Sequence, residues 1–167
     1  MHASKLSELQ FQLGSIIRSV EAAIEVRITS GSWPHGLRAQ FTAGTASIPG
    51  AQVILLDSGG DDEVPFVGYG RSIQLSRCVA SVEVSGQLRV CVKALLGDKI
   101  VVNRVKVFKP KIAGVSEGSL RVGFYIREKV FKQAKTAGDT CDDPLALGAG
   151  FCTFGFNFSW SVISFFG

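Results

Sequence analysis

The sequence is poor in the side chains on which enzyme catalysis most often depends. It has two histidines in 167 residues, His2 near the start and His35 inside a Trp-Pro-His-Gly turn. It contains no phosphate-binding loop, no nucleophile elbow and no HExxH helix. The Gly-Tyr-Gly-Arg run at 68–71 is too short for a dinucleotide fingerprint. We therefore predict a protein that is not an enzyme and that requires no cofactor.

Long hydrophobic runs and a metal-binding cysteine pattern are also missing. Apolar stretches fall far short of the roughly 20 residues of a membrane span, and polar residues interrupt the first seventeen positions too often for a secretory signal. The four cysteines, at 78, 91, 141 and 152, form no CxxC pair, which argues against zinc. We expect a cytoplasmic protein that is not transmembrane and has buried, reduced thiols. A disulfide between Cys78 and Cys91 is the alternative.

The composition that remains is typical of a β-protein. Apolar residues make up 46% of the chain, with twelve Phe and nineteen Gly alongside many Val and Ile, a balance that favours strands and turns. Apolar residues recur with period two, as in Ile24, Val26 and Ile28, or in the Phe-rich run at 154–160. This pattern predicts an all-β fold, an antiparallel β-sandwich of about eight or nine strands, with a C2-like arrangement left open.

A single domain over residues 1–167 is expected, because no linker or repeat interrupts the pattern. Residues 136–150 are predicted to be a loop or an insertion, and residues 151–167 the terminal strand. The first fifteen residues fit a strand, with a short N-terminal helix as the alternative. Around Ser85-Gly86 we predict a hairpin in which Val79 faces Val92.

Basic residues concentrate on one predicted strand and just after it. Within a net charge of +4, Arg104 and Lys106 lie on the face opposite Val105 and Val107, and two further lysines follow. Such a strip fits an anionic ligand, either RNA or phospholipid, or else an outward sheet face or a charged edge that blocks aggregation. Trp33 is a candidate for stacking on a base. The candidate binding residues are therefore Arg104, Lys106, Lys109, Lys111 and Trp33.

Acidic residues gather in one predicted loop. Asp57, Asp61 and Asp62 lie within or beside a Gly-rich turn. Loop carboxylates at one end of a β-sandwich are the ligands that calcium requires. A C2-like calcium and phospholipid module is therefore an alternative function.

Several stretches of the sequence resemble a known plant family. These are Lys5-Leu6-Ser7, LQFQLGSIIRSVEAAIEVRI, GSWPHGLRAQFTA, ILLDS, IQLSRCVASVE and the closing SWSV. In this order they are similar to a plant domain of unknown function, expanded in grasses, that follows the toxin in the jasmonate-induced ribosome-inactivating proteins of cereals. The resemblance covers most of residues 5–131 and returns at the last strand.

The resemblance implies a non-enzymatic interaction module linked to plant stress and defence. The Glu-Ala-x-Arg helix of the toxin does not carry over, because Ile24 stands where its arginine would be. A remnant of an rRNA N-glycosidase-associated protein with a translation-linked role is the alternative. Family members carry a longer segment before Lys5, so the resemblance suggests an N-terminally truncated chain. Loss of strands there favours a protein partner or self-association.

Overall fold

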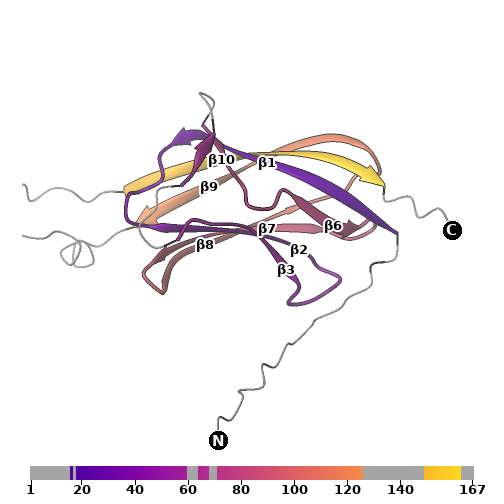
Figure 1. Cartoon of the computed structure of the whole chain (residues 1–167), viewed down its shortest axis with the longest axis horizontal. Helices are drawn as coiled ribbons and strands as arrows, with labels where there is room; N and C mark the ends of the chain where they lie inside the picture. The colour runs from indigo at the N-terminus through magenta and orange to yellow at the C-terminus, as the bar shows by residue number, and fades with distance from the viewer. Residues whose placement is uncertain (1–15, 17, 60–63, 68–70, 126–148, 163–167) are drawn as a thin grey trace, which may run out of the picture.

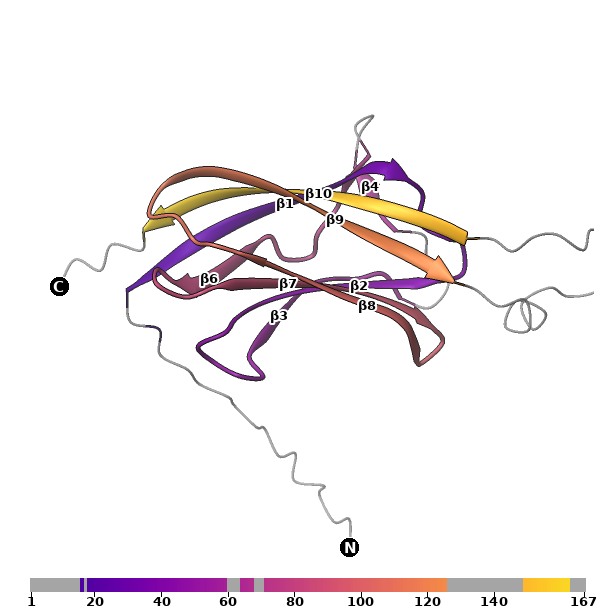
Figure 2. The same cartoon turned by 180° about the vertical axis from the view of Figure 1, so that it is seen from behind.

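The computed structural model describes residues 16, 18–59, 64–67, 71–125 and 149–162 (Figures 1 and 2). These residues form ten strands, of which two are two residues long. The strands are β1 (Ser19–Gly31), β2 (Arg38–Thr45), β3 (Gln52–Asp57), β4 (Phe66–Val67), β5 (Ser72–Ile73), β6 (Val79–Glu83), β7 (Leu88–Leu96), β8 (Lys99–Phe108), β9 (Gly114–Tyr125) and β10 (Ala149–Val162).

Two antiparallel sheets stack face to face, as Figure 1 shows. Sheet A has six strands in the order β4-β5-β1-β10-β9, with β6 also pairing with β1. Sheet B has four strands in the order β3-β2-β7-β8. The predicted antiparallel β-sandwich is therefore confirmed. β10 overlaps the terminal strand predicted at 151–167 but begins at Ala149, within the predicted loop, and residues 163–167 lie outside the described residues.

The core lies between the sheets and follows from the period-two pattern. Ile24 and Val26 on β1 stand opposite Phe158 and Phe156 on β10, and all four side chains are buried. From sheet B, the Phe41 ring meets Phe154 edge-on at a centroid distance of 5.1 Å. Each fully buried Phe contributes about 2 kcal/mol or more of transfer free energy, so this aromatic layer dominates the stability of the sandwich.

The predicted hairpin around Ser85-Gly86 is wrong. β6 pairs with β1 in sheet A, whereas β7 lies in sheet B. Val79 is exposed, while Val92 is buried on the opposite layer. The amide of Gly86 donates to the carbonyl of Glu83, forming a turn that carries the chain from one sheet to the other. Alternation places a strand on a core but does not select its partner, and β1 offers the longer apolar row.

The disulfide between Cys78 and Cys91, considered as the alternative to reduced thiols, does not form, because both thiols are free. Cys91 is buried, as predicted, but Cys78 is exposed. Burial raises the pKa of the Cys152 thiol to about 12, so it stays neutral in the core. Cys141, the alternatives for residues 1–15 and most of the predicted loop at 136–150 lie outside the described residues.

No helix in the part of the chain that the structure describes meets the length and hydropathy needed to cross a membrane.

Candidate anion-binding hollow on sheet B

The outward face of sheet B forms a mixed polar and apolar surface. Side chains cross it in rows, because strand partners point to the same side. One row runs from Ile54 through Thr42 and Cys91 to Val105. The middle two are buried and the outer two are exposed, so the centre of the face lies lower than its edges.

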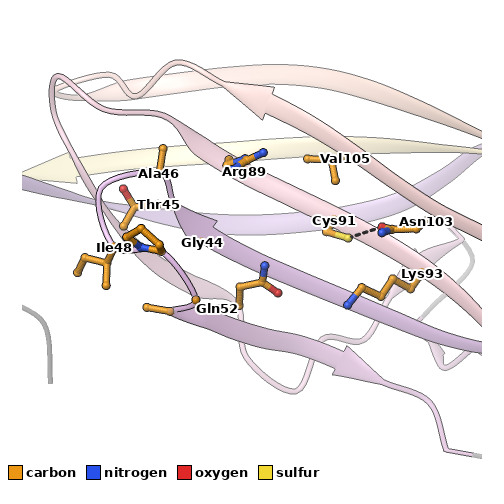
Figure 3. A pocket seen from close by; sticks show the side chains of 13 residues that line it. Gly44, Thr45, Ala46, Ile48, Gln52, Arg89, Cys91, Lys93, Asn103 and Val105 are labelled. Atoms are coloured by element: carbon orange, nitrogen blue, oxygen red, sulfur yellow. Dashed lines mark hydrogen bonds between the residues drawn. The ribbon is translucent and has the colours of Figure 1, made fainter. Parts of the chain in front are cut away.

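The connection between β2 and β3 closes one end of this face. After β2 the chain passes through a turn in which Gly50 has φ of +82°, a conformation that glycine adopts without strain. The Ser47 hydroxyl bonds the Glu83 carboxylate, which fixes the connection to β6. The result is a hollow of ≈ 300 Å³, lined on one side by residues between Gly44 and Gln52 and on the other by Arg89, Cys91, Lys93, Asn103 and Val105. We call it the outer hollow (Figure 3).

Neutral polar groups line the floor of the outer hollow. The Cys91 thiol donates to Asn103 Oδ1 at 3.0 Å, the dashed line in Figure 3. Thr42 Oγ1 donates to Gln52 Oε1 at 3.3 Å. Burial raises the pKa of the Cys91 thiol, so at neutral pH it is a protonated donor and not a nucleophile. The amide nitrogens of Gln52 and Asn103 remain as hydrogen-bond donors for a ligand.

The charge of the outer hollow is positive. Arg89 and Lys93 project from β7 on either side of Cys91, and among the residues that the structure describes no Asp or Glu lines the hollow. Neither cation forms an ion pair within the described residues. Another cation on sheet B does have an acidic partner: Arg38 on β2 forms a salt bridge with Asp57 on β3. An unmatched pair of cations beside amide donors is suited to a carboxylate or phosphate group.

The predicted basic residues lie elsewhere, at the edge where β8 and β9 approach each other. Arg104 and Lys106 stand opposite Val92 and Val90, so they are on the core-facing side of sheet B and not on an outward face. The valines between them point outward instead. The Lys106 ammonium donates to the Ser119 carbonyl of β9 at 2.5 Å. The predicted placement of Arg104 and Lys106 on the face opposite Val105 and Val107 is therefore confirmed, whereas the alternative of an outward sheet face does not hold for these two cations.

The other two residues of the predicted strip lie between β8 and β9. Lys109 is exposed. The Lys111 ammonium donates to the Val115 carbonyl at 2.8 Å. Lys106 and Lys111 thus occupy edge carbonyls of β9, a placement that suits the alternative of a charged edge that blocks aggregation.

Trp33 is held against the core. Its indole Nε1 donates to the Leu37 carbonyl at 2.8 Å, and its ring meets Phe124 edge-on at 5.1 Å. Its ring also lies 5.8 Å from that of Phe154. These contacts assign the ring a packing role and leave little of it available to a base.

The predicted acidic cluster is described in part. Asp57 accepts hydrogen bonds from Arg38 and from Gln40, the latter at 3.1 Å. Asp61 and Asp62 lie outside the described residues. Within the described ranges no group of three or more His, Cys, Asp or Glu side chains is placed to hold a metal ion. The calcium site stays a prediction.

Residues 1–128 match the family described as a domain of unknown function, DUF6598. The chain belongs to this family. No curated protein and no solved structure matches it. The match ends before β10, yet in this DUF6598 domain β10 lies between β1 and β9 in the centre of sheet A. Residues 149–162 are therefore structurally part of the domain.

The residues of the outer hollow escaped the sequence analysis of this DUF6598 domain. Arg89, Cys91 and Lys93 alternate with buried Val90 and Val92, which is the one local signal that they share an outward face. Gln52 and Asn103 reach the same face from β3 and β8. Their proximity depends on the strand order of sheet B, which periodicity does not encode.

Proposed function

We propose that this DUF6598 domain is a non-enzymatic binding module that holds an anionic ligand in the outer hollow. The observation that carries the proposal is the pair of unmatched cations, Arg89 and Lys93, on either side of a hollow that no acidic residue lines in the described part of the chain. Two cations and two amides form a donor set for one carboxylate or phosphate group.

The size and the walls of the outer hollow limit which ligands fit into it. A volume of ≈ 300 Å³ is at the lower end of small-molecule sites, so a single acidic group with a short body fits better than a long polymer. Ile48 and Val105 supply apolar walls on opposite sides. The preferred ligand is thus a small organic anion with an apolar portion.

The chemistry of the floor supports binding over catalysis. Cys91 is the nucleophilic residue type nearest the cations, but its thiol is buried, neutral and already bonded to Asn103. A neutral thiol that donates its proton to an amide oxygen is a poor attacking group.

The proposal is tested by titrating the ¹⁵N-labelled chain with inorganic phosphate and with citrate, followed by NMR. We expect saturable shifts of backbone amides in residues 44–52 and 89–93. In a double variant, Arg89→Gln with Lys93→Gln, the affinity falls by about a hundredfold or more, because the two charged hydrogen bonds together contribute about 3 kcal/mol or more.

A matched double variant controls for the loss of two charges. Arg27 and Arg77 are exposed and lie outside the outer hollow. Replacing both by Gln lowers the net charge equally and should leave the affinity within about twofold of the original chain. Equal weakening in both double variants would show that the anion binds by net charge alone and would refute the proposal.

The biological setting that we propose rests on the family resemblance of the sequence alone. It is that of a companion domain in plant stress or defence proteins, acting in the cytoplasm beside ribosome-inactivating toxins. A binding test with a purified toxin domain of that class addresses this part separately from the anion titration.

A further inference from the structure

The free edge of β8 is a second candidate binding surface. β8 has ten residues, Lys99–Phe108, and is the last strand of sheet B after β7. Within the described ranges, its other edge pairs with no strand, and Figure 2 shows it along the border of the sandwich. A free edge offers a row of backbone N–H and C=O groups to an added strand.

Most outward side chains along this edge are apolar, with Asn103 as a polar residue among them. Val105 is 48% exposed and Val107 is 43% exposed. At the start of the strand, Ile100 is 49% and Val101 is 40% exposed. Most outward strand positions in a sandwich are polar, so this exposed row is unusual for a face that meets water alone.

In the middle of the same edge the inward side chains are cationic, with the apolar Val102 and Phe108 on either side of them in the same row. Arg104 and Lys106 stand opposite Val92 and Val90 at the mouth between the two sheets. Lys106 reaches across to the Ser119 carbonyl. Arg104 is exposed, and within the described residues it has no acidic partner. The β8 edge thus has a mostly apolar outer row and an inner row with two cations at its centre.

These two rows define the chemistry of a complementary strand. A strand added beside β8 directs its side chains alternately to the outer and the inner row. Apolar side chains match the outer valines, and acidic side chains match Arg104 and Lys106. A second copy of β8 would instead bring the two cations of each copy to one strand pair, where like charges repel.

We propose that the β8 edge binds an extended protein segment in which apolar residues alternate with Asp or Glu, and that this segment extends sheet B by one strand. Backbone hydrogen bonds supply most of the affinity, and the two rows of side chains supply the specificity. The site is distinct from the outer hollow, although Asn103 and Val105 border both. The inference therefore does not depend on the ligand proposed above.

The test uses a labelled peptide, Val-Glu-Val-Glu-Val-Glu-Val, and the full chain, followed by fluorescence anisotropy. We expect binding that weakens as salt is added and that is at least about tenfold tighter than for the peptide with Lys in place of Glu. Two further peptides carry N-methyl groups on alternate residues. Methylation of the peptide edge that faces β8 abolishes binding, while methylation of the other edge preserves it.

Variants of the chain locate the site. Arg104→Glu should lower the affinity for the acidic peptide by about tenfold. Circular dichroism and a thermal melt should confirm that this variant folds. Arg77→Glu, an equal change in net charge at an exposed residue away from β8, should leave binding within about twofold. The double variant Arg89→Gln with Lys93→Gln should also keep its affinity for the peptide. This result would separate the β8 edge from the outer hollow.

Three results would overturn the inference. The first is equal binding of the Glu and Lys peptides. The second is binding that survives both patterns of N-methylation. The third is that the original chain forms a dimer by light scattering and that Arg104→Glu changes the fraction of dimer. A second copy of the chain would then be the occupant of the β8 edge.

Discussion

The residue pair Arg38 and Asp57 shows how one contact ties two neighbouring strands together. The guanidinium of Arg38 donates through Nε and through a terminal nitrogen to both carboxylate oxygens, and Gln40 adds a third hydrogen bond. These bonds, and above all the one from Arg38, lower the pKa of Asp57 from 3.8 to about 2. The pair lies at the end of β3, where a frayed strand would uncover Leu55 and Leu56.

We predict that Asp57→Asn makes the protein less stable in a pH-dependent way. Because the folded pKa is the lower one, the carboxylate contributes its full stabilisation above about pH 4 and loses it as the pH falls toward 2. The free energy of unfolding should drop by about 1 to 2 kcal/mol at pH 7, since the pair is partly exposed. Urea titrations at pH 7, 4 and 3 should show the difference from the original chain shrinking.

Glu117→Gln provides the control for the loss of one carboxylate, because Glu117 is exposed on β9. Its stability should follow that of the original chain across the same pH range. A penalty for Asp57→Asn that is as large at pH 3 as at pH 7 would show that shape, and not charge, explains the effect.

At the scale of elements, the contact between β8 and β9 depends on the absence of a side chain. Phe108, the last residue of β8, packs its ring 4.5 Å from that of Phe158, measured between centroids. A Cβ atom added to Gly118 on β9 would lie 2.4 Å from Cε1 of Phe108. Glycine at 118 therefore provides the space in which the Phe108 ring reaches the core from an edge strand.

We predict that Gly118→Ala lowers the free energy of unfolding by about 1 to 3 kcal/mol, as expected when a packed ring must move. Gly123→Ala is the matched control, because a Cβ there meets nothing within 4 Å and the residue lies on the same strand. Thermal melts of the two variants should diverge by several degrees. Equal melting temperatures would show that the Phe108 ring is free to shift.

At the same scale, strands were easier to predict than their pairing. The alternation around Phe154–Trp160 predicted β10, because a strand that buries one face records this in its own residues. The partner of β6 was mispredicted, because Val79–Glu83 alternates in the same way beside either β1 or β7. The alternative of an outward face for Arg104 and Lys106 failed for a related reason: at the end of a sheet, the core-facing side also meets water.

For the whole molecule, β10 is the strand on which sheet A depends. It pairs with β1 from Val20 to Gly31 and with β9 from Gly114 to Tyr125. It also supplies four fully buried or nearly buried aromatic rings, Phe154, Phe156, Phe158 and Trp160. Without this strand, β1 and β9 would each lose a partner and the core would lose its central aromatic row.

We therefore predict that a chain ending at residue 128, where the family match stops, does not fold cooperatively. Its thermal melt should lack a sharp transition, because both edges left by β10 and a large apolar surface meet water. A synthetic peptide of residues 149–162, added in excess, should restore β-sheet circular dichroism. A cooperative melt of the shortened chain by itself would contradict the prediction.

The sequence by itself determined that this protein is built from strands, since the alternation of apolar and polar residues is local and survives without knowledge of any partner. It also put Arg104 and Val105 on opposite faces of one strand, which is β8 in the structure. Only the tertiary structure decided which face meets the core and which strands become neighbours. The outer hollow and the β8 edge both arise from contacts between residues distant in the chain, and local periodicity carries no information about those contacts.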